Sequence, residues 1–299
     1  MRFVHSFFFG NYFYGLCMAA LSVEASLQQR YPLNPLHYYA AVFLATVFFY
    51  TAAYITEGPG NAANPRSMWY AKNYRLVKSS QAIFAAILAA YGLWIVLQRY
   101  ASLAQLAFTT WLAILLFPLS GLLYYGLSGK GIGNYNLRRI GWLKPFTIGF
   151  TWAGLVTVYP VLFYHLQKDL PYNPTLVGAF LFLKNFMFIT VLCIMFDIKD
   201  YAVDHNLQIK TFVVTNGLRR TIFAILLPLC FLGLGSFIYY ALTLHFHPVK
   251  ILLNIIPFAL LIAVAYSMYR RRSILYYLII IDGLMLAKAV CGTIAMTFF

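Results

Sequence analysis

The chain has 299 residues, of which 62% are hydrophobic and only 10% are charged, and its mean hydropathy is +0.75. This composition excludes an ordinary soluble protein and predicts an all-α, polytopic integral membrane protein. The formal net charge of +15 would suggest a nucleic-acid partner for a soluble domain. Here the basic residues follow the loops between apolar segments, so we expect no nucleic-acid binding.

Apolar segments of near membrane-spanning length recur along the whole chain. A helix needs about 20 apolar residues to cross a bilayer. Nine segments approach this length, at residues 3–25, 36–56, 80–98, 103–125, 146–165, 176–196, 221–244, 250–269 and 274–296. Because no polar interval is long enough for a soluble domain, we expect residues 1–299 to form a single transmembrane domain. A four-helix offset suggests possible halves, 1–125 and 146–269, followed by the last helix, 274–296.

The distribution of lysine and arginine predicts the orientation in the membrane. Most of these residues lie near the N-terminus and in the loops after the second, fourth, sixth and eighth segments. Cytoplasmic loops carry this excess of positive charge. We therefore expect a cytoplasmic N-terminus, cytoplasmic basic loops and, after nine crossings, a C-terminus outside. The basic loops are also suited to contact anionic membrane lipid.

Charged residues inside the apolar segments are costly in hydrocarbon and indicate either pairing or function. Lys184 and Asp282 could form an ion pair between the sixth and ninth segments. Glu24 and Lys288 are two further intramembrane charges. If such groups lined a continuous path, they would instead indicate a small-solute transporter.

An acidic cluster follows the sixth segment, in a chain with only seven acidic residues. On a helix, Asp197, Asp200 and Asp204 would point within an arc of about 60°. Three carboxylates on one face repel one another unless cations are present, and hard oxygen ligands suit Mg²⁺ bridging to a phosphate group. The alternative is a solvated turn, in which the carboxylates pair with neighbouring basic residues.

The sequence FDIKDYAVDHNLQIKT around this cluster resembles the second aspartate-rich motif of the UbiA superfamily of intramembrane prenyltransferases. The resemblance implies a nine-helix, UbiA-like arrangement. It also implies that Asp197, Asp200 and Asp204 are catalytic residues that hold Mg²⁺ against a prenyl diphosphate, with Lys210 near the phosphates. The implied reaction transfers an isoprenyl group from that diphosphate to an apolar acceptor.

The first aspartate-rich motif of this family has no counterpart after the second segment, where the chain has FFYTAAYITEGPGN. Tyr54 and Glu57 are the nearest polar candidates there. Basic residues could contact the phosphates in place of a metal ion, since lysine and arginine bind phosphate. The candidates are Arg66, Lys72, Arg75 and Lys78 in the first basic loop, and Arg138, Arg139 and Lys144 in the second. The same departure leaves open a catalytically inactive member that binds a prenyl lipid.

Overall fold

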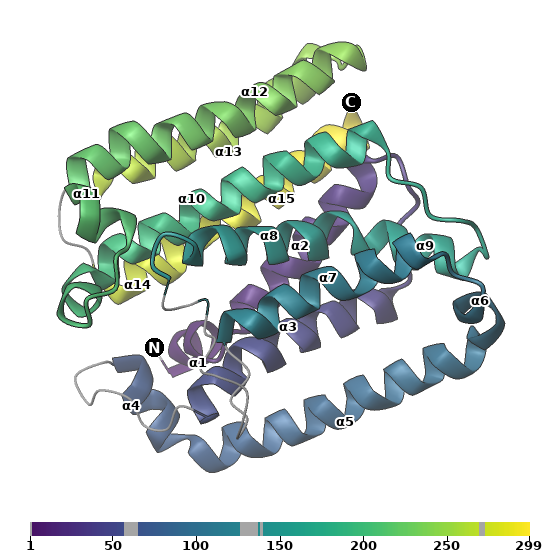
Figure 1. Cartoon of the computed structure of the whole chain (residues 1–299), viewed down its shortest axis with the longest axis horizontal. Coiled ribbons are helices and arrows are strands. Elements are labelled where there is room, and N and C mark those ends of the chain that lie inside the picture. Colours follow the sequence, from purple (N-terminus) through teal and green to yellow (C-terminus); the bar gives the residue numbers. More distant parts are fainter. Residues whose placement is uncertain (1, 57–64, 126–136, 138–139, 269–272) are drawn as a thin grey trace.

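The computed structural model describes residues 2–56, 65–125, 137, 140–268 and 273–299. All regular elements within these ranges are helical (Figure 1), in agreement with the predicted all-α class. The first half contains α1 (Arg2–Phe9), α2 (Tyr12–Gln28), α3 (Leu36–Thr56), α4 (Pro65–Lys72), α5 (Tyr74–Gln98), α6 (Tyr100–Ala104) and α7 (Phe108–Tyr125). The second half contains α8 (Lys144–Thr157), α9 (Tyr159–Gln167), α10 (Leu176–Asn206), α11 (Phe212–Thr221), η2 (Ile222–Leu226), α12 (Leu227–Thr243), α13 (Pro248–Ser267), α14 (Ile274–Tyr276), η3 (Tyr277–Ile281) and α15 (Gly283–Phe298).

Several of these helices are long and apolar enough to cross a membrane, which supports a multi-pass membrane protein. Among the described residues they are Tyr74–Gln98, Lys144–Gln167, Leu176–Asn206, Phe212–Thr243, Pro248–Ser267 and Ile274–Phe298. Shorter apolar helices cover Leu36–Ala52 and Phe108–Tyr124. The structure therefore provides six candidate spans by length and composition. The predicted total of nine stays a prediction.

The first predicted segment, 3–25, differs from the expected continuous helix. It is divided into α1 and α2, and Asn11 between them has a φ of 65°. This left-handed conformation cannot continue a right-handed helix. Asn11 is fully buried, and its side-chain amide donates to the hydroxyls of Thr51 and Tyr70, each at 3.0 Å. The helix therefore breaks at a residue whose side chain belongs to a buried polar network. Hydropathy alone does not detect such a break.

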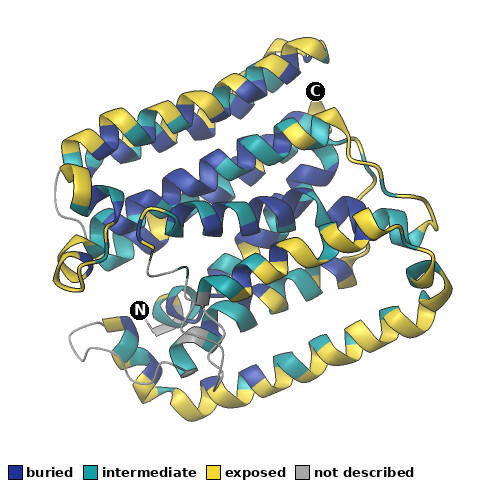
Figure 2. Cartoon of the chain, viewed as in Figure 1, coloured by how far each residue is buried: buried dark blue, intermediate teal, exposed yellow. Residues whose placement is uncertain are grey.

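The helices are arranged so that a buried centre lies between two exposed outer helices. α5 and α12 lie at opposite sides of the molecule, with α8, α10 and α2 between them (Figure 1). Figure 2 shows α5 largely exposed and α10 largely buried. Within α10, Phe188, Val191 and Ile194 have no exposed surface. The apolar surface of the outer helices is what a helix facing lipid requires.

The two central helices α8 and α10 approach one another closely through a glycine. A Cβ atom on Gly149 of α8 would lie 2.2 Å from Oγ1 of Thr190 on α10. Only a residue without a side chain fits this contact. The close packing brings the beginning of α8, at Lys144, beside the acidic segment of α10.

Candidate functional site

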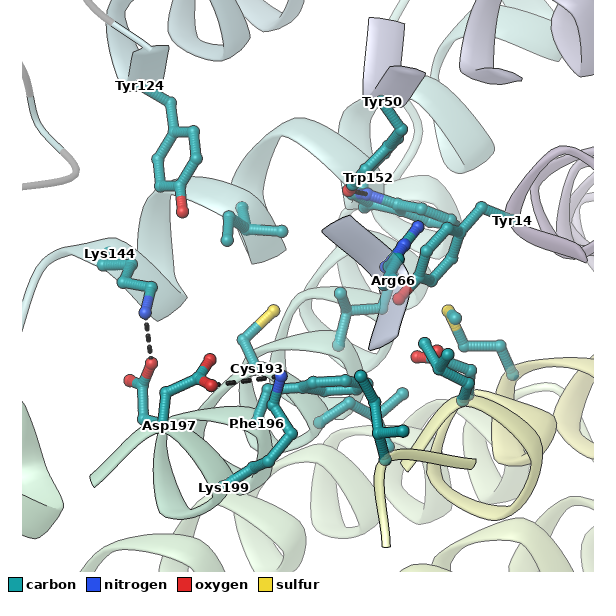
Figure 3. A pocket seen from close by; sticks show the side chains of 18 of the residues that line it. Tyr14, Tyr50, Arg66, Tyr124, Lys144, Trp152, Cys193, Phe196, Asp197 and Lys199 are labelled. Atoms are coloured by element: carbon teal, nitrogen blue, oxygen red, sulfur yellow. Dashed lines mark hydrogen bonds and ion pairs between the residues drawn. The ribbon is translucent and has the colours of Figure 1, made fainter. Parts of the chain in front are cut away.

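A polar cavity of about 270 Å³ lies beside the acidic segment of α10 (Figure 3). It receives side chains from α2, α3, α4, α7, α8, α10, α14, η3 and α15. We call it the polar chamber. Its charged lining residues are Arg66, Lys144, Asp197, Lys199, Asp200 and Asp282. The chamber therefore combines three basic groups and three carboxyl groups, contributed by helices distant in the sequence.

Two of the three predicted aspartates line the polar chamber. Nζ of Lys144 donates a 2.6 Å hydrogen bond to Oδ1 of the fully buried Asp197. Oδ2 of Asp197 is also buried and has no hydrogen-bond partner among the described residues. Asp200 is partly exposed, and its Oδ1 lies 3.0 Å from Nζ of Lys199. The expected cluster thus supplies two neighbouring carboxylates, each already near a lysine.

Asp204, the third predicted aspartate, is buried but is not among the residues that line the chamber. It lies on the same helix, since α10 continues to Asn206. Seven residues of helix separate Asp204 from Asp197, which is a rise of about 10 Å. A shared helix face therefore does not bring all three carboxylates to one cavity.

The opposite side of the chamber carries Arg66, as Figure 3 shows. Arg66 belongs to α4 and is buried; its Nε donates to the carbonyl of Phe9 at 3.3 Å, and its Nη2 donates to Oδ1 of Asn11. The guanidinium carbon lies 4.6 Å from the ring centroid of Tyr54. This ring contact and the two hydrogen bonds hold the guanidinium in a defined position.

Tyr70 supports Arg66 from the same short helix. Its ring stacks on that of Tyr54 with centroids 4.6 Å apart and an interplanar angle of 5°. Its hydroxyl donates a 2.8 Å hydrogen bond to the carbonyl of Phe9. Burial raises the pKa of Tyr70 to about 12, and Arg66 opposes that shift. Tyr70 therefore stays neutral at physiological pH and remains a hydrogen-bond donor.

Asp282 is a chamber residue that the sequence did not identify as part of the site. It is buried directly after the π-helical turn η3 and before α15, and its carboxyl accepts a side-chain hydrogen bond from Tyr14. π-helical turns frequently occur at functional sites. None of the ion pairs formed within the described ranges includes Asp282. The sequence signal for a functional role was the position of this carboxyl inside an apolar segment. The partner predicted from the sequence, Lys184, is wrong.

The predicted ion pair between Lys184 and Asp282 does not form. Nζ of Lys184 instead lies 3.7 Å from Oε1 of Glu24 and donates to Oδ1 of Asn254 at 2.7 Å. Nζ of Lys288 lies 2.6 Å from Oε2 of Glu24. Lys184 is not among the lining residues of the polar chamber. Of the four intramembrane charges, Asp282 lines the polar chamber, and Glu24 and Lys288, like Lys184, are not among its lining residues.

A second, apolar cavity of about 610 Å³ adjoins the polar chamber. We call it the apolar chamber; its lining comes mainly from α3, α5, α7 and α8. Both chambers share the lining residues Tyr50, Tyr124, Ile148 and Trp152. Nε1 of Trp152 donates a 2.6 Å hydrogen bond to the hydroxyl of Tyr50, which fixes both rings at this boundary. The two chambers together suit a ligand with a charged head and a long apolar chain.

The remaining predicted site residues divide into three groups. Tyr54 and Lys144 line the polar chamber. Lys72 and Lys210 are exposed and do not line it. Glu57, Arg138 and Arg139 lie outside the described residues.

The donor set of the chamber fits one Mg²⁺ ion better than two. Asp197 and Asp200 present neighbouring carboxylates, and Oδ2 of Asp197 is a buried oxygen that lacks a partner in the described part of the chain. Mg²⁺ commonly takes one or two protein carboxylates and completes its shell with water and phosphate. On the opposite side the described residues offer the Tyr54 hydroxyl, the cationic Arg66 and a single carboxyl group, Asp282, which together do not form a second metal site. Within the described ranges, no group of three or more His, Cys, Asp and Glu residues could hold a metal ion.

Comparison with known proteins found no matching family model, no matching curated protein and no matching solved structure. Function is therefore inferred from the residues and the geometry of the two chambers.

Proposed function

We propose that this protein is a UbiA-like, nine-helix membrane prenyltransferase that moves an isoprenyl group from a prenyl diphosphate to an apolar acceptor. The observation that carries the proposal is that a charged chamber and an apolar chamber share a boundary, at which Tyr50 and Trp152 line both. A prenyl diphosphate has the same division into an anionic head and an apolar chain. The acidic motif FDIKDYAVDHNLQIKT, which resembles that of the superfamily, contributes Asp197 and Asp200 to the charged chamber.

The charged residues of the polar chamber have complementary roles in binding the diphosphate. Asp197 and Asp200 would hold Mg²⁺, which neutralises phosphate charge and makes the diphosphate a better leaving group. Lys144 and Lys199 lie beside these carboxylates and orient them through contacts of 2.6 and 3.0 Å. Arg66 lies opposite these carboxylates, and its permanent positive charge would bind the phosphates without a metal ion. The prenyl chain would then extend past Trp152 into the apolar chamber.

The proposed transfer requires stabilisation of two developing charges. The bond between the prenyl C1 and the diphosphate oxygen breaks, and its electron pair leaves with the diphosphate, where Arg66 and the lysines stabilise the negative charge. The aromatic faces of Tyr50 and Trp152, at the boundary of the chambers, stabilise positive charge on the prenyl carbon. The acceptor donates an electron pair to C1 and loses a proton. This proton passes to a carboxylate that lines the polar chamber.

A second candidate function is a catalytically inactive protein that binds a prenyl diphosphate. The absence of the first aspartate-rich motif after the second apolar segment, where Tyr54 and Glu57 are the nearest polar residues, favours this alternative. Both functions require the same binding site, and they differ only in whether the C1–oxygen bond is broken.

A transfer assay separates these functions. Purified protein in lipid nanodiscs would be incubated with radiolabelled farnesyl or geranylgeranyl diphosphate, Mg²⁺ and an extract of membrane lipids. We expect the label to appear in a new apolar product, and we expect Asp197→Asn to abolish this transfer. Binding of the diphosphate without product would establish the inactive alternative. Absence of both binding and product would contradict the proposed function.

A further inference from the structure

Arg66 is the charged group of the polar chamber that the superfamily resemblance does not explain. It comes from α4, which follows α3 and precedes α5, and its side chain lines the chamber opposite the α10 carboxylates. A buried guanidinium is costly in a membrane protein and therefore indicates a specific role. Lys72 at the end of the same helix is exposed, so the inward position is specific to Arg66.

The surroundings of Arg66 hold it in place before any ligand binds. Phe9 and Asn11 accept hydrogen bonds from two different nitrogens of the guanidinium. The left-handed conformation of Asn11 presents its amide oxygen to Arg66 while its amide nitrogen contacts Thr51. A guanidinium has five N–H donors in one plane, so Arg66 can hydrogen-bond to Phe9, to Asn11 and to further acceptors at the same time.

The two sides of the chamber are therefore different in chemistry. The α10 side carries Asp197 and Asp200, which suit a divalent cation, whereas the α4 side carries a fixed cation, Arg66. Two aspartate motifs would place a metal ion on each side. Among the described residues, a second metal ion on the α4 side would meet the positive guanidinium, the ring of Tyr54 and a single carboxyl group, Asp282, which already interacts electrostatically with Arg66.

We infer that Arg66 replaces one metal ion, so that the polar chamber holds a diphosphate with one divalent cation and one arginine. This inference rests on the proposed function and specifies how its site recognises the diphosphate. Arginine binds two phosphate oxygens through parallel N–H groups, which a lysine cannot reproduce. The site should therefore need less divalent cation than a two-metal site and should depend strongly on the guanidinium.

Counting bound metal tests the inference directly. The full-length protein in nanodiscs would be titrated with Mn²⁺, as a paramagnetic substitute for Mg²⁺, in the presence of the thiolo analogue of farnesyl diphosphate. Electron paramagnetic resonance measures the Mn²⁺ that remains in solution, and a radiolabelled analogue measures the bound diphosphate. We expect one Mn²⁺ for each bound diphosphate. Two Mn²⁺ for each diphosphate would overturn the inference while leaving the proposed function intact.

Substitution of Arg66 provides the second readout. Arg66→Gln should weaken binding of the analogue by about tenfold or more, as expected for loss of a charge-assisted contact, without changing the number of bound Mn²⁺ ions. Arg66→Lys should give an intermediate affinity. Arg75→Gln is the matched control, because Arg75 is exposed in the first turn of α5 and does not line the chamber. Binding by Arg66→Gln equal to that of Arg75→Gln would overturn the inference.

The remaining outcomes are also decisive. If Arg66→Gln does not fold, as judged by size-exclusion chromatography, the metal count of the wild-type protein decides the question alone. If the wild-type protein binds no analogue at any Mn²⁺ concentration, both the proposed function and this inference are wrong.

Discussion

Glu24 shows how single residues maintain charge inside this apolar molecule. Its carboxylate is fully buried and lies within ion-pair distance of both Lys184 and Lys288. Gln28 donates a further 2.7 Å hydrogen bond to the same carboxylate. A buried charge is tolerated when it is paired and hydrogen-bonded. Glu24 is therefore the group that allows two buried lysines to coexist.

Replacing Glu24 with glutamine should strongly destabilise the protein. The substitution keeps the shape of the side chain but leaves two buried lysines without their carboxylate, which should cost about 3 to 5 kcal/mol of unfolding free energy. Asp169→Asn is the matched control, because Asp169 pairs with Arg99 in an exposed position, where such a pair contributes about 1 kcal/mol or less. Denaturant unfolding in detergent measures both. A similar, small effect of the two substitutions would contradict the role of Glu24.

At the residue scale, the sequence predicted the Asp197 and Asp200 pair and included Tyr54 and Arg66 among several candidates to face it, but it did not single them out. Hydropathy and helical periodicity locate α10 and its acidic face without information about neighbouring helices. From the sequence, Arg66 cannot be distinguished from the other basic residues that fix the orientation in the membrane. It differs from the exposed Lys72 because it is buried against α1 and the beginning of α2, and this burial depends on tertiary contacts. The pairing of Lys184 with Glu24 rather than Asp282 depends on how the helices are rotated in the folded protein. Sequence spacing does not determine that rotation.

At the scale of elements, glycines determine how closely the central helices approach one another. Gly292 on α15 faces α2, where a Cβ atom would lie 2.5 Å from Cγ and Oε1 of Glu24. Apolar segments predicted a helix over residues 274–296 but neither the π-helical turn η3 within it nor the break at Asn11 in the first segment. The positions of helices therefore follow from the sequence more directly than their local irregularities do.

The effect of Gly292→Ala tests this close approach. Alanine normally favours a helix over glycine by about 1 kcal/mol. At Gly292 the added methyl group would displace Glu24, which both lysines hold in place, so we expect net destabilisation by about 1 to 3 kcal/mol. Gly235→Ala in α12 is the control, because a Cβ atom there meets no atom within 4 Å. Thermal unfolding of both variants should show opposite changes, and a stabilising effect at Gly292 would contradict the packing.

The apolar chamber can be tested through Gly121 on α7. Gly121 lines this chamber, and a Cβ atom there would lie 3.4 Å from both Phe49 and Thr151. Gly121→Leu should occupy space needed by a prenyl chain and weaken binding of farnesyl thiolodiphosphate by about tenfold or more. Binding of inorganic diphosphate should be unchanged, because it occupies only the polar chamber. Gly92→Leu on α5 is the control, because a Cβ atom there meets no atom within 4 Å. If Gly121→Leu weakens binding of both ligands equally, the two chambers do not bind separate parts of the ligand.

At the scale of the whole molecule, the two termini lie at opposite ends of the helical bundle (Figure 1). This arrangement is what an odd number of membrane crossings requires. The positive charge of the loops predicts that the N-terminus and the acidic motif are cytoplasmic. Nine crossings would then place the C-terminus outside.

Labelling with a membrane-impermeant maleimide tests this topology in a cysteine-free variant. A cysteine introduced at the exposed Lys72 should react only after the membrane is opened, whereas one added after Phe299 should react in intact cells. Lys168→Cys, in an exposed position between α9 and α10, should also react in intact cells. If the C-terminal cysteine does not react in intact cells, the nine-helix arrangement and the proposed cytoplasmic location of the polar chamber are both wrong.

The most direct measurement is a crystal structure of the protein with Mn²⁺ and the thiolo analogue of farnesyl diphosphate, with anomalous diffraction used to locate the metal. We predict diphosphate density in the polar chamber and prenyl-chain density in the apolar chamber. We also predict one anomalous peak beside Asp197 and Asp200, with Arg66 contacting the phosphates from the other side. Ligand density that lies outside both chambers, with no metal at the two aspartates, would contradict the proposed site.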